Sequence, residues 1–220
     1  MEFLQEVLSL YIDRADWFFN LLIEHIALSA TAIAIAGVLG LLLGIFISEH
    51  RKLAPVIISI CNVFYTVPSI ALLGLLIPFF GVGNTNALVA LVVYALMPMV
   101  RNTYVGLTDI DPDVIEAARG MGSTQTQTLI HVRLPMATSV ILAGLRSMVV
   151  MTISVAGIAA FVGAGGLGVA IYRGITIFNP AMTFAGGLLI ALLALAADLL
   201  LGLIEKRYKK KRRLTNHAKS

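Results

Sequence analysis

The chain has 220 residues, of which 59% are hydrophobic and 13% are charged, and its mean hydropathy is +0.93. Soluble domains average roughly 45–50% apolar and about 25% charged residues, so a soluble globular domain and a disordered chain are both excluded. A disulfide-stapled secreted domain is excluded as well, because Cys61 is the single cysteine. The composition therefore predicts an integral membrane protein.

The net charge of +4 comes from the run EKRYKKKRR at 205–213. This run directly follows an apolar segment, a position at which basic residues face the cytoplasm and anionic lipid headgroups. We therefore expect residues 207–220 to form a basic cytoplasmic tail, and we expect no nucleic-acid partner.

An N-terminal segment precedes the first apolar window. Glu2 and Glu6 come before the first basic residue, Arg14, so residues 1–21 lack the positive region of a cleavable signal peptide. We expect an extracytoplasmic or interfacial segment, with Trp17 at the level of the lipid headgroups.

Charge-free windows locate the membrane spans, and they run over 25–48, 53–100, 147–172 and 174–197. One crossing needs about 20 apolar residues, so the second window holds two crossings, separated by the turn GVGNTN. No segment alternates with the period of two that a membrane β-barrel requires. We predict an all-α transmembrane domain over 22–206, with about five spans near 22–47, 54–80, 86–106, 136–162 and 181–205.

The orientation follows from lysine and arginine, which are enriched in cytoplasmic loops. With the N-terminus outside and the C-terminus inside, every basic residue except Arg14 and Arg173 lies inside or at the inner edge. The reverse orientation would put nearly all of them outside, and we reject it.

Glycine and proline mark special positions within the spans. Gly40 and Gly44 form a GxxxG pair, which predicts close helix packing. Pro68 and Pro78 interrupt the second span, and Pro98 lies near the inner end of the third. We therefore expect helices that are not straight, with neighbouring groups satisfying the freed backbone.

The inside loop over 107–135 is long for such a compact chain, which indicates a function. Asp111 followed by Pro112 predicts the capped start of a short helix, and Gly122 predicts its left-handed end. Ser123 is the expected cap of a second short helix.

That second helix is expected to run to about Val132, with Pro135 opening the next span. The loop is therefore predicted as two short helices joined by a glycine bend on the cytoplasmic face. The first of them offers small side chains flanked by charges, a surface that can enter a cleft on another protein closely.

The same loop resembles a known family. Glu116-Ala117-Ala118, then Gly122, then Val132-Arg133-Leu134-Pro135 is similar to the cytoplasmic-loop signature of permease subunits of binding-protein-dependent ABC importers, with Val132 in place of Ile. The stretch from 65 to 107, which begins YTVPSIALLGLL, and DPDVIEAARGMG resemble the osmoprotectant branch, which imports glycine betaine, carnitine or choline. The similarity covers most of 24–206.

This resemblance implies a type I ABC importer permease fold in a bacterial plasma membrane. It implies a coupling helix that docks on an ATPase subunit through Glu116, Ala117, Ala118, Arg119 and Gly122. It also implies an ATPase dimer that binds ATP and Mg, a second permease subunit that is identical or related, and an extracytoplasmic solute-binding protein.

The residues agree that this chain is not an enzyme, with no cofactor of its own. It has no P-loop for ATP hydrolysis, and its histidines show no metal-ligand spacing. GAGGLG at 163–168 lacks the strand and the acidic residue of a dinucleotide site, so we interpret it as the outer turn after the fourth span.

Pathway-lining candidates are Tyr65, Thr66, Pro68 and Ser69, at the proline break of the second span, although helix packing explains them equally well. Two alternatives stay open for the function. The first is a permease for methionine or another small nutrient, and the second is a membrane scaffold or channel without an ATPase.

Overall fold

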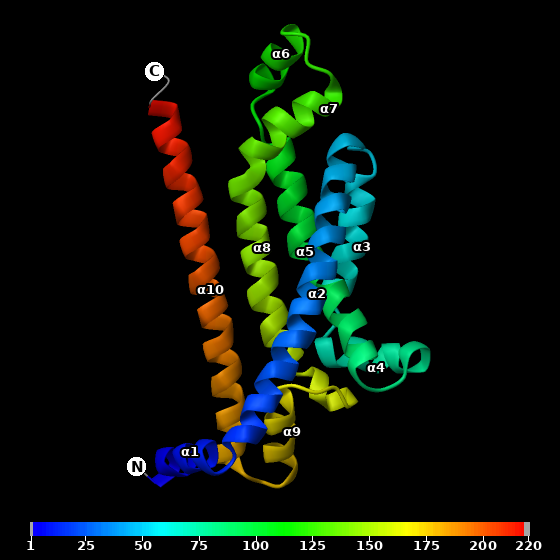
Figure 1. The fold of residues 1–220 in the computed structure, drawn as a ribbon. Helices are drawn as coiled ribbons and strands as arrows, with labels where there is room; N and C mark the ends of the chain where they lie inside the picture. Colours follow the sequence, from blue (N-terminus) through cyan, green and yellow to red (C-terminus); the bar gives the residue numbers. More distant parts are fainter. Residues whose placement is uncertain (1, 218–220) are drawn as a thin grey trace.

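The structure is a computed structural model that describes residues 2–217, with side chains described up to Arg207. In that part of the chain the regular elements are all helical, which confirms the predicted fold class. The helices form an elongated bundle, and the two ends of the chain lie at opposite ends of it (Figure 1). This placement agrees with an odd number of membrane crossings.

Three long helices and one continuous helical run made of several elements have the length and apolarity of membrane spans. They are α2 (Ala15–Glu49), α5 (Asn84–Thr108), α10 (Pro180–His217) and the run Gln125–Ala156, which ends in α8 (Leu134–Ala156). The shorter elements are α1 (Glu2–Asp13), α3 (Ala54–Thr66), α4 (Ser69–Phe80), α6 (Pro112–Gly120), α7 (Gln125–Thr128), a π-helical turn (Leu129–Arg133), a 3-10 turn (Ala159–Val162) and α9 (Gly168–Thr176).

Helix α5 is the centre of the bundle, since it packs against α2, α8, α3 and α4. The GxxxG pair makes the α2–α5 contact close, as the spacing predicts. A Cβ atom on Gly40 would lie 2.7 Å from the Cβ of Met99, and one on Gly44 would lie 2.4 Å from the Cβ of Thr103. Any larger side chain would therefore force the two helices apart.

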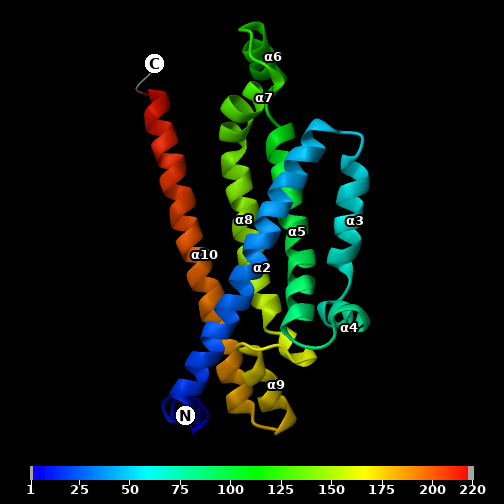
Figure 2. The same ribbon diagram turned by 45° about the vertical axis from the view of Figure 1, so that its right-hand side comes forward.

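The segment expected as the second span is broken more sharply than the prolines alone suggest. Helices α3 and α4 meet at 101°, so α4 runs across the bundle while α3 stays parallel to α5 (Figure 2). The cause is Pro68, which keeps Val67 extended at φ −65° and ψ 132°. The Tyr94 hydroxyl donates a hydrogen bond to the freed carbonyl of Val67.

The helices of the cytoplasmic loop differ from the prediction in two details. Thr124, and not Ser123, caps α7, because only Thr124 has a glutamine three residues later, and Thr124 and Gln127 form a reciprocal capping box. The helix also does not stop before Pro135 but continues through the π-helical turn into α8. A regular α-turn would press the proline ring against the carbonyl of His131, and the wider turn relieves this clash.

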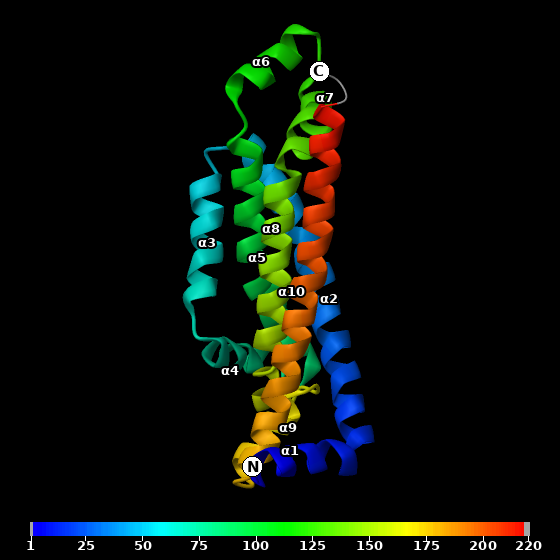
Figure 3. The ribbon, with the colours of Figure 1, turned by 90° about the vertical axis from the view of Figure 1, so that its left-hand side faces the viewer.

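At the outer end of the bundle, α1 lies flat across the tips of the spans (Figure 3). The Tyr11 hydroxyl donates to the Ala185 carbonyl at 2.7 Å, and burial raises the pKa of this tyrosine. Leu4, Leu8 and Ile12 share the exposed face of α1, which suits a helix at the membrane surface.

Three hydrogen bonds join the outer ends of α2 and α5 to the segment after α8. The Glu24 carboxylate accepts from the Gly166 amide at 3.0 Å, and the Asn84 side-chain oxygen accepts from the Gly165 amide at 3.0 Å. The Gly83 amide donates to the Val162 carbonyl at 2.7 Å. The GAGGLG turn is therefore a structural tie between three spans.

A substitution tests the packing at Gly44. Gly44→Ala should lower the stability of the protein by about 1–3 kcal/mol, because the new methyl group overlaps Thr103. Gly187→Ala is the matched control, since a Cβ there meets no atom within 4 Å and alanine favours the helix. Thermal unfolding in detergent should show a lower midpoint for the first variant and an equal or higher midpoint for the second; equal midpoints would contradict the close contact.

Candidate functional site

The cytoplasmic loop stands clear of the inner ends of the spans. Helix α6 and α7 project beyond α5 and α8, at the end of the bundle where α10 also ends (Figure 1). The Asp111 carboxylate caps α6 by accepting from the Asp113 amide at 3.0 Å, and Gly122 takes the predicted left-handed conformation at φ +86°. The loop therefore presents one well-defined helix on a turn that glycine makes possible.

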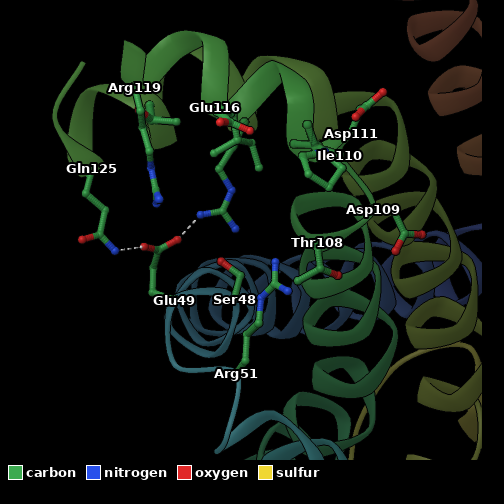
Figure 4. Close-up of a pocket in the computed structure, with 14 residues that line it drawn as sticks. Ser48, Glu49, Arg51, Thr108, Asp109, Ile110, Asp111, Glu116, Arg119 and Gln125 are labelled. Carbon is green, nitrogen blue, oxygen red and sulfur yellow. Dashed lines mark hydrogen bonds and ion pairs between the residues drawn. The ribbon is translucent and has the colours of Figure 1, made fainter. Parts of the chain in front are cut away.

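The loop is anchored to the inner end of α2 by one ion pair. The Arg133 guanidinium contacts the Glu49 carboxylate and donates to the Leu107 carbonyl at 3.1 and 3.3 Å. The second oxygen of Glu49 accepts from the Gln125 side chain at 2.7 Å (Figure 4). One carboxylate thus holds both the start of α7 and the π-helical turn, while the same arginine reaches α5.

Both partners are well shielded from solvent, with side-chain exposures of 10% for Arg133 and 18% for Glu49. Removing one partner of a buried pair costs about 3–5 kcal/mol, because the other charge is left uncompensated. The anchor therefore fixes the position of the loop strongly.

A cavity of about 850 Å³ lies between α6 and the inner ends of α2 and α5. Most of the residues that line it are polar or charged, with Arg51, Glu116 and Arg119 among them (Figure 4). A space of this size and polarity can admit side chains of another protein.

The structure separates the five predicted docking residues into three groups. Glu116 and Arg119 line the cavity, and Ala118 is the buried residue of α6. Ala117 and Gly122 are exposed. The helix therefore offers small residues on its outer surface and charges at the entrance of the cavity.

The predicted pathway residues lie far from the loop, at the α3–α4 break. Tyr65 packs edge-on against Tyr94 with ring centroids 6.4 Å apart, and the Thr66 hydroxyl donates to the Val63 carbonyl at 2.8 Å. Pro68 is exposed and Ser69 is half-buried at the start of α4.

The sequence analysis missed two further polar residues on this segment. Ser59 and Asn62 are exposed on α3 and share one helix face with Thr66, because the three positions are spaced by three and four residues. That spacing inside a charge-free window was a usable signal. It also missed the anchor, since nothing local links Glu49 to Arg133, although Glu49 is the first acidic residue after an apolar span.

Among the residues whose side chains are described, no group of three or more His, Cys, Asp or Glu is placed to hold a metal ion. The membrane-spanning helices and the anchored cytoplasmic loop define a membrane-embedded protein with a charged cavity at its inner end.

Comparison with known proteins identifies the class more closely. The model of the family described as binding-protein-dependent transport system inner membrane component matches residues 17–210, and the chain belongs to this family. It is therefore a membrane component of a bacterial transport system, located in the inner membrane.

Relatives of known function align over nearly the whole chain. The osmoprotectant import permease protein OsmW of Salmonella typhimurium is 42% identical over 195 residues, covering 86% of this chain and 91% of the relative. The glycine betaine/carnitine/choline transport system permease protein OpuCD of Bacillus subtilis is 37% identical over 207 residues, covering 94% and 90%. The carnitine transport permease protein OpuCB of Listeria monocytogenes is 38% identical over 191 residues, covering 86% and 88%.

Solved structures share the fold. An inward-facing conformation of the MetNI methionine ABC transporter superposes with a TM-score of 0.80 at 25% identity, covering 87% of this chain and 95% of the other. An amino acid ABC transporter superposes with a TM-score of 0.72 at 23% identity, covering 89% and 96%. The architecture is thus that of ABC importer permeases, as predicted.

The ion pair that anchors the loop can be tested directly. Glu49→Gln should loosen the loop, because Arg133 loses its counter-charge while the spans keep their own packing. Hydrogen exchange of the amides in 109–133 should rise at least tenfold, while the amides of α5 stay protected. Lys52→Gln, an exposed charge change in the same α2–α3 turn, is the control and should leave exchange unchanged. Equal exchange in both variants would show that the ion pair does not hold the loop.

Proposed function

We propose that this chain is the permease subunit of an ATP-driven importer and that α6 is the helix through which an ATPase subunit drives it. The observation that carries the proposal is the placement of the loop signature. Glu116 to Arg119 lie on a capped helix beyond the spans and Gly122 lies in the turn that follows it, on a loop anchored by Arg133 and Glu49. Such an anchor allows a push on the loop to reach the membrane domain.

The helical connection supports the same mechanism. Helix α7, the π-helical turn and α8 form one helical run. A displacement of the loop would therefore move α8 as a rigid body. Transport then follows from a two-state movement of packed helices, biased by nucleotide on the inside and by a loaded binding protein on the outside.

The partners follow from this role. A separate ATPase dimer would bind ATP and Mg, and this chain would carry no catalytic residue of its own. A second permease subunit, identical or related, would complete the pathway, and an extracytoplasmic solute-binding protein would deliver the solute. The basic tail would contact anionic lipid; its side chains from residue 208 onward lie outside the described ones.

For the solute, we propose a quaternary-ammonium osmoprotectant such as glycine betaine, carnitine or choline. The support is that relatives 37–42% identical over most of the chain carry these solutes, or osmoprotectants, in their names. The methionine transporter is similar at 25% identity, which supports the fold more than the solute.

For the pathway, we propose the polar edge of α3, formed by Ser59, Asn62 and Thr66, together with Tyr65 and the Pro68–Ser69 break. These polar side chains are unsuited to hydrocarbon, because polar groups inside a membrane face a protein partner or a water-filled space. Among the described helices, α3 packs mainly against α5, so its polar edge is free to face a second subunit across the pathway.

Purification from the native membrane tests the function. Tagged wild-type protein in mild detergent should retain an ATPase, and a quaternary-ammonium-binding protein in the same sample would support the solute. Gly122→Ala should lose the ATPase, because the left-handed turn that ends α6 is strained for alanine by roughly 1–2 kcal/mol. Gly120→Ala, two residues away and in open space, should retain it.

Each other outcome has a defined meaning. A different binding protein beside the ATPase would keep the mechanism and overturn the solute. Absence of an ATPase from the wild-type sample in several detergents would overturn the role of α6 and support a scaffold or channel.

Thiol labelling tests the pathway. In a Cys61→Ser background, cysteine at Asn62 or Thr66 should react with a water-soluble thiol reagent in the assembled transporter, because these positions face water. Cysteine at Ile60 or Phe64, which point away from the polar edge, should react at least tenfold more slowly. Equal rates at all four positions would rule out this face as the pathway.

A further inference from the structure

Three charged side chains meet between α8 and α10. Arg146 and Asp198 lie in otherwise apolar stretches, and Glu205 lies at the start of the basic run. The Arg146 guanidinium forms a two-pronged ion pair with Asp198, at 2.5 Å from Nε to Oδ1 and 2.6 Å from Nη2 to Oδ2. Its remaining nitrogen, Nη1, lies 3.7 Å from Oε2 of Glu205. One arginine of α8 therefore contacts two carboxylates of α10.

The two carboxylates lie along the same face of α10. They are seven residues apart, which is two helical turns or about 10 Å along the axis. Gly202 lies between them, and a Cβ there would approach the Arg146 Cζ to 3.2 Å. Because Gly202 has no side chain, the guanidinium can lie close to the α10 backbone.

The rest of the α8–α10 contact is apolar and lies nearer the outer end. Ile153 of α8 packs there with Ile190 and Ala194 of α10, and Ala197 borders the cluster. On the cytoplasmic side of Ala197, the Arg146 cluster connects α8 to α10. Figure 1 shows that α10 then leads away from α8 toward its inner end.

The cluster also opens to one side. A cavity of about 610 Å³ lies beside it, lined by Ser147, Met151 and the three charged residues, among others. The side chains of Arg146 and Asp198 are 36% and 32% exposed. Charged groups at this depth face a protein partner or water rather than lipid, so the guanidinium has room to move without entering hydrocarbon.

We propose that Arg146, Asp198 and Glu205 form a sliding contact that lets α8 move along α10 during transport. When α8 shifts toward the cytoplasm, the guanidinium moves from Asp198 toward Glu205. Because Glu205 is already 3.7 Å away, a shift of one turn, about 5 Å, is enough to exchange the partners. The arginine keeps a counter-charge throughout, so no step leaves an unpaired charge within the membrane.

This proposal rests on the proposed function, since the movement of α8 is attributed to the ATPase that acts on α6. A sliding contact differs from a fixed ion pair in one respect. A fixed pair needs only Arg146 and Asp198, whereas a sliding contact needs Glu205 as its second position.

The test measures the distance between α8 and α10 in the complete transporter. Spin labels at Ser154→Cys and Leu203→Cys, in a Cys61→Ser background, report on the two helices outside the cluster. Pulsed electron paramagnetic resonance compares the nucleotide-free state with the state trapped by ATP, Mg and vanadate, and single-label samples identify distances between subunits. We expect the distance to change by about 5 Å in the unsubstituted cluster.

Glu205→Gln should reduce this change by at least half, because the second position is lost. Lys206→Gln, a charge change at the neighbouring exposed position, should leave it intact. The double variant Arg146→Asp with Asp198→Arg restores a pair but puts the carboxylate on the moving helix, and it too should lose the change. Full movement in Glu205→Gln, or in the double variant, would overturn the sliding contact and indicate a fixed pair.

The unsubstituted cluster also gives a decisive result. An assembled complex whose distance is the same in both states overturns the sliding contact alone. Failure of the ATPase to co-purify overturns the proposed function, and the sliding contact with it.

Discussion

Hydrocarbon offers no hydrogen-bond partners, and this constraint governs the structure. Every backbone group freed within the membrane must be satisfied by the chain itself. Where Pro68 breaks the second span, the Tyr94 hydroxyl reaches across from α5 to the open carbonyl of Val67. Where α4 turns into α5, the Asn86 amide donates to the carbonyls of Leu73 and Gly81 at 3.1 and 2.9 Å. The sharp turn of α4 is possible because α5 supplies these groups.

The same rule governs charge. The described ion pairs join different helices at the inner side of the bundle: Glu49 with Arg133, and Arg146 with two carboxylates of α10. Each pair connects the helical run 125–156, which begins in the cytoplasmic loop, to a neighbouring helix. Charge therefore links the cytoplasmic loop and the spans here, while the outer part of the bundle is held by apolar packing and by hydrogen bonds to the backbone.

Features with a local cause could be predicted from the sequence. The spans follow from charge-free length, the α2–α5 contact from Gly40 and Gly44, and the start and end of α6 from Asp111 and Gly122. The features that could not be predicted depend on residues far apart in the chain. The Glu49–Arg133 anchor joins positions 84 residues apart, and the carbonyl freed at the 101° bend is bonded by Tyr94 of another helix. Pro68 indicated a break, but its angle is set by tertiary packing.

The hydrogen-bonded tie at the outer end has a consequence for how such a chain can open. Glu24, Asn84 and the backbone of 162–166 bind the outer tips of α2, α5 and α8 into one block. Those tips cannot spread apart without breaking the tie. In the proposed pair of permease subunits, an outward opening would therefore form between the two subunits, with each chain tilting about this block. The same tie makes 162–166 a segment in which inserted residues would be poorly tolerated.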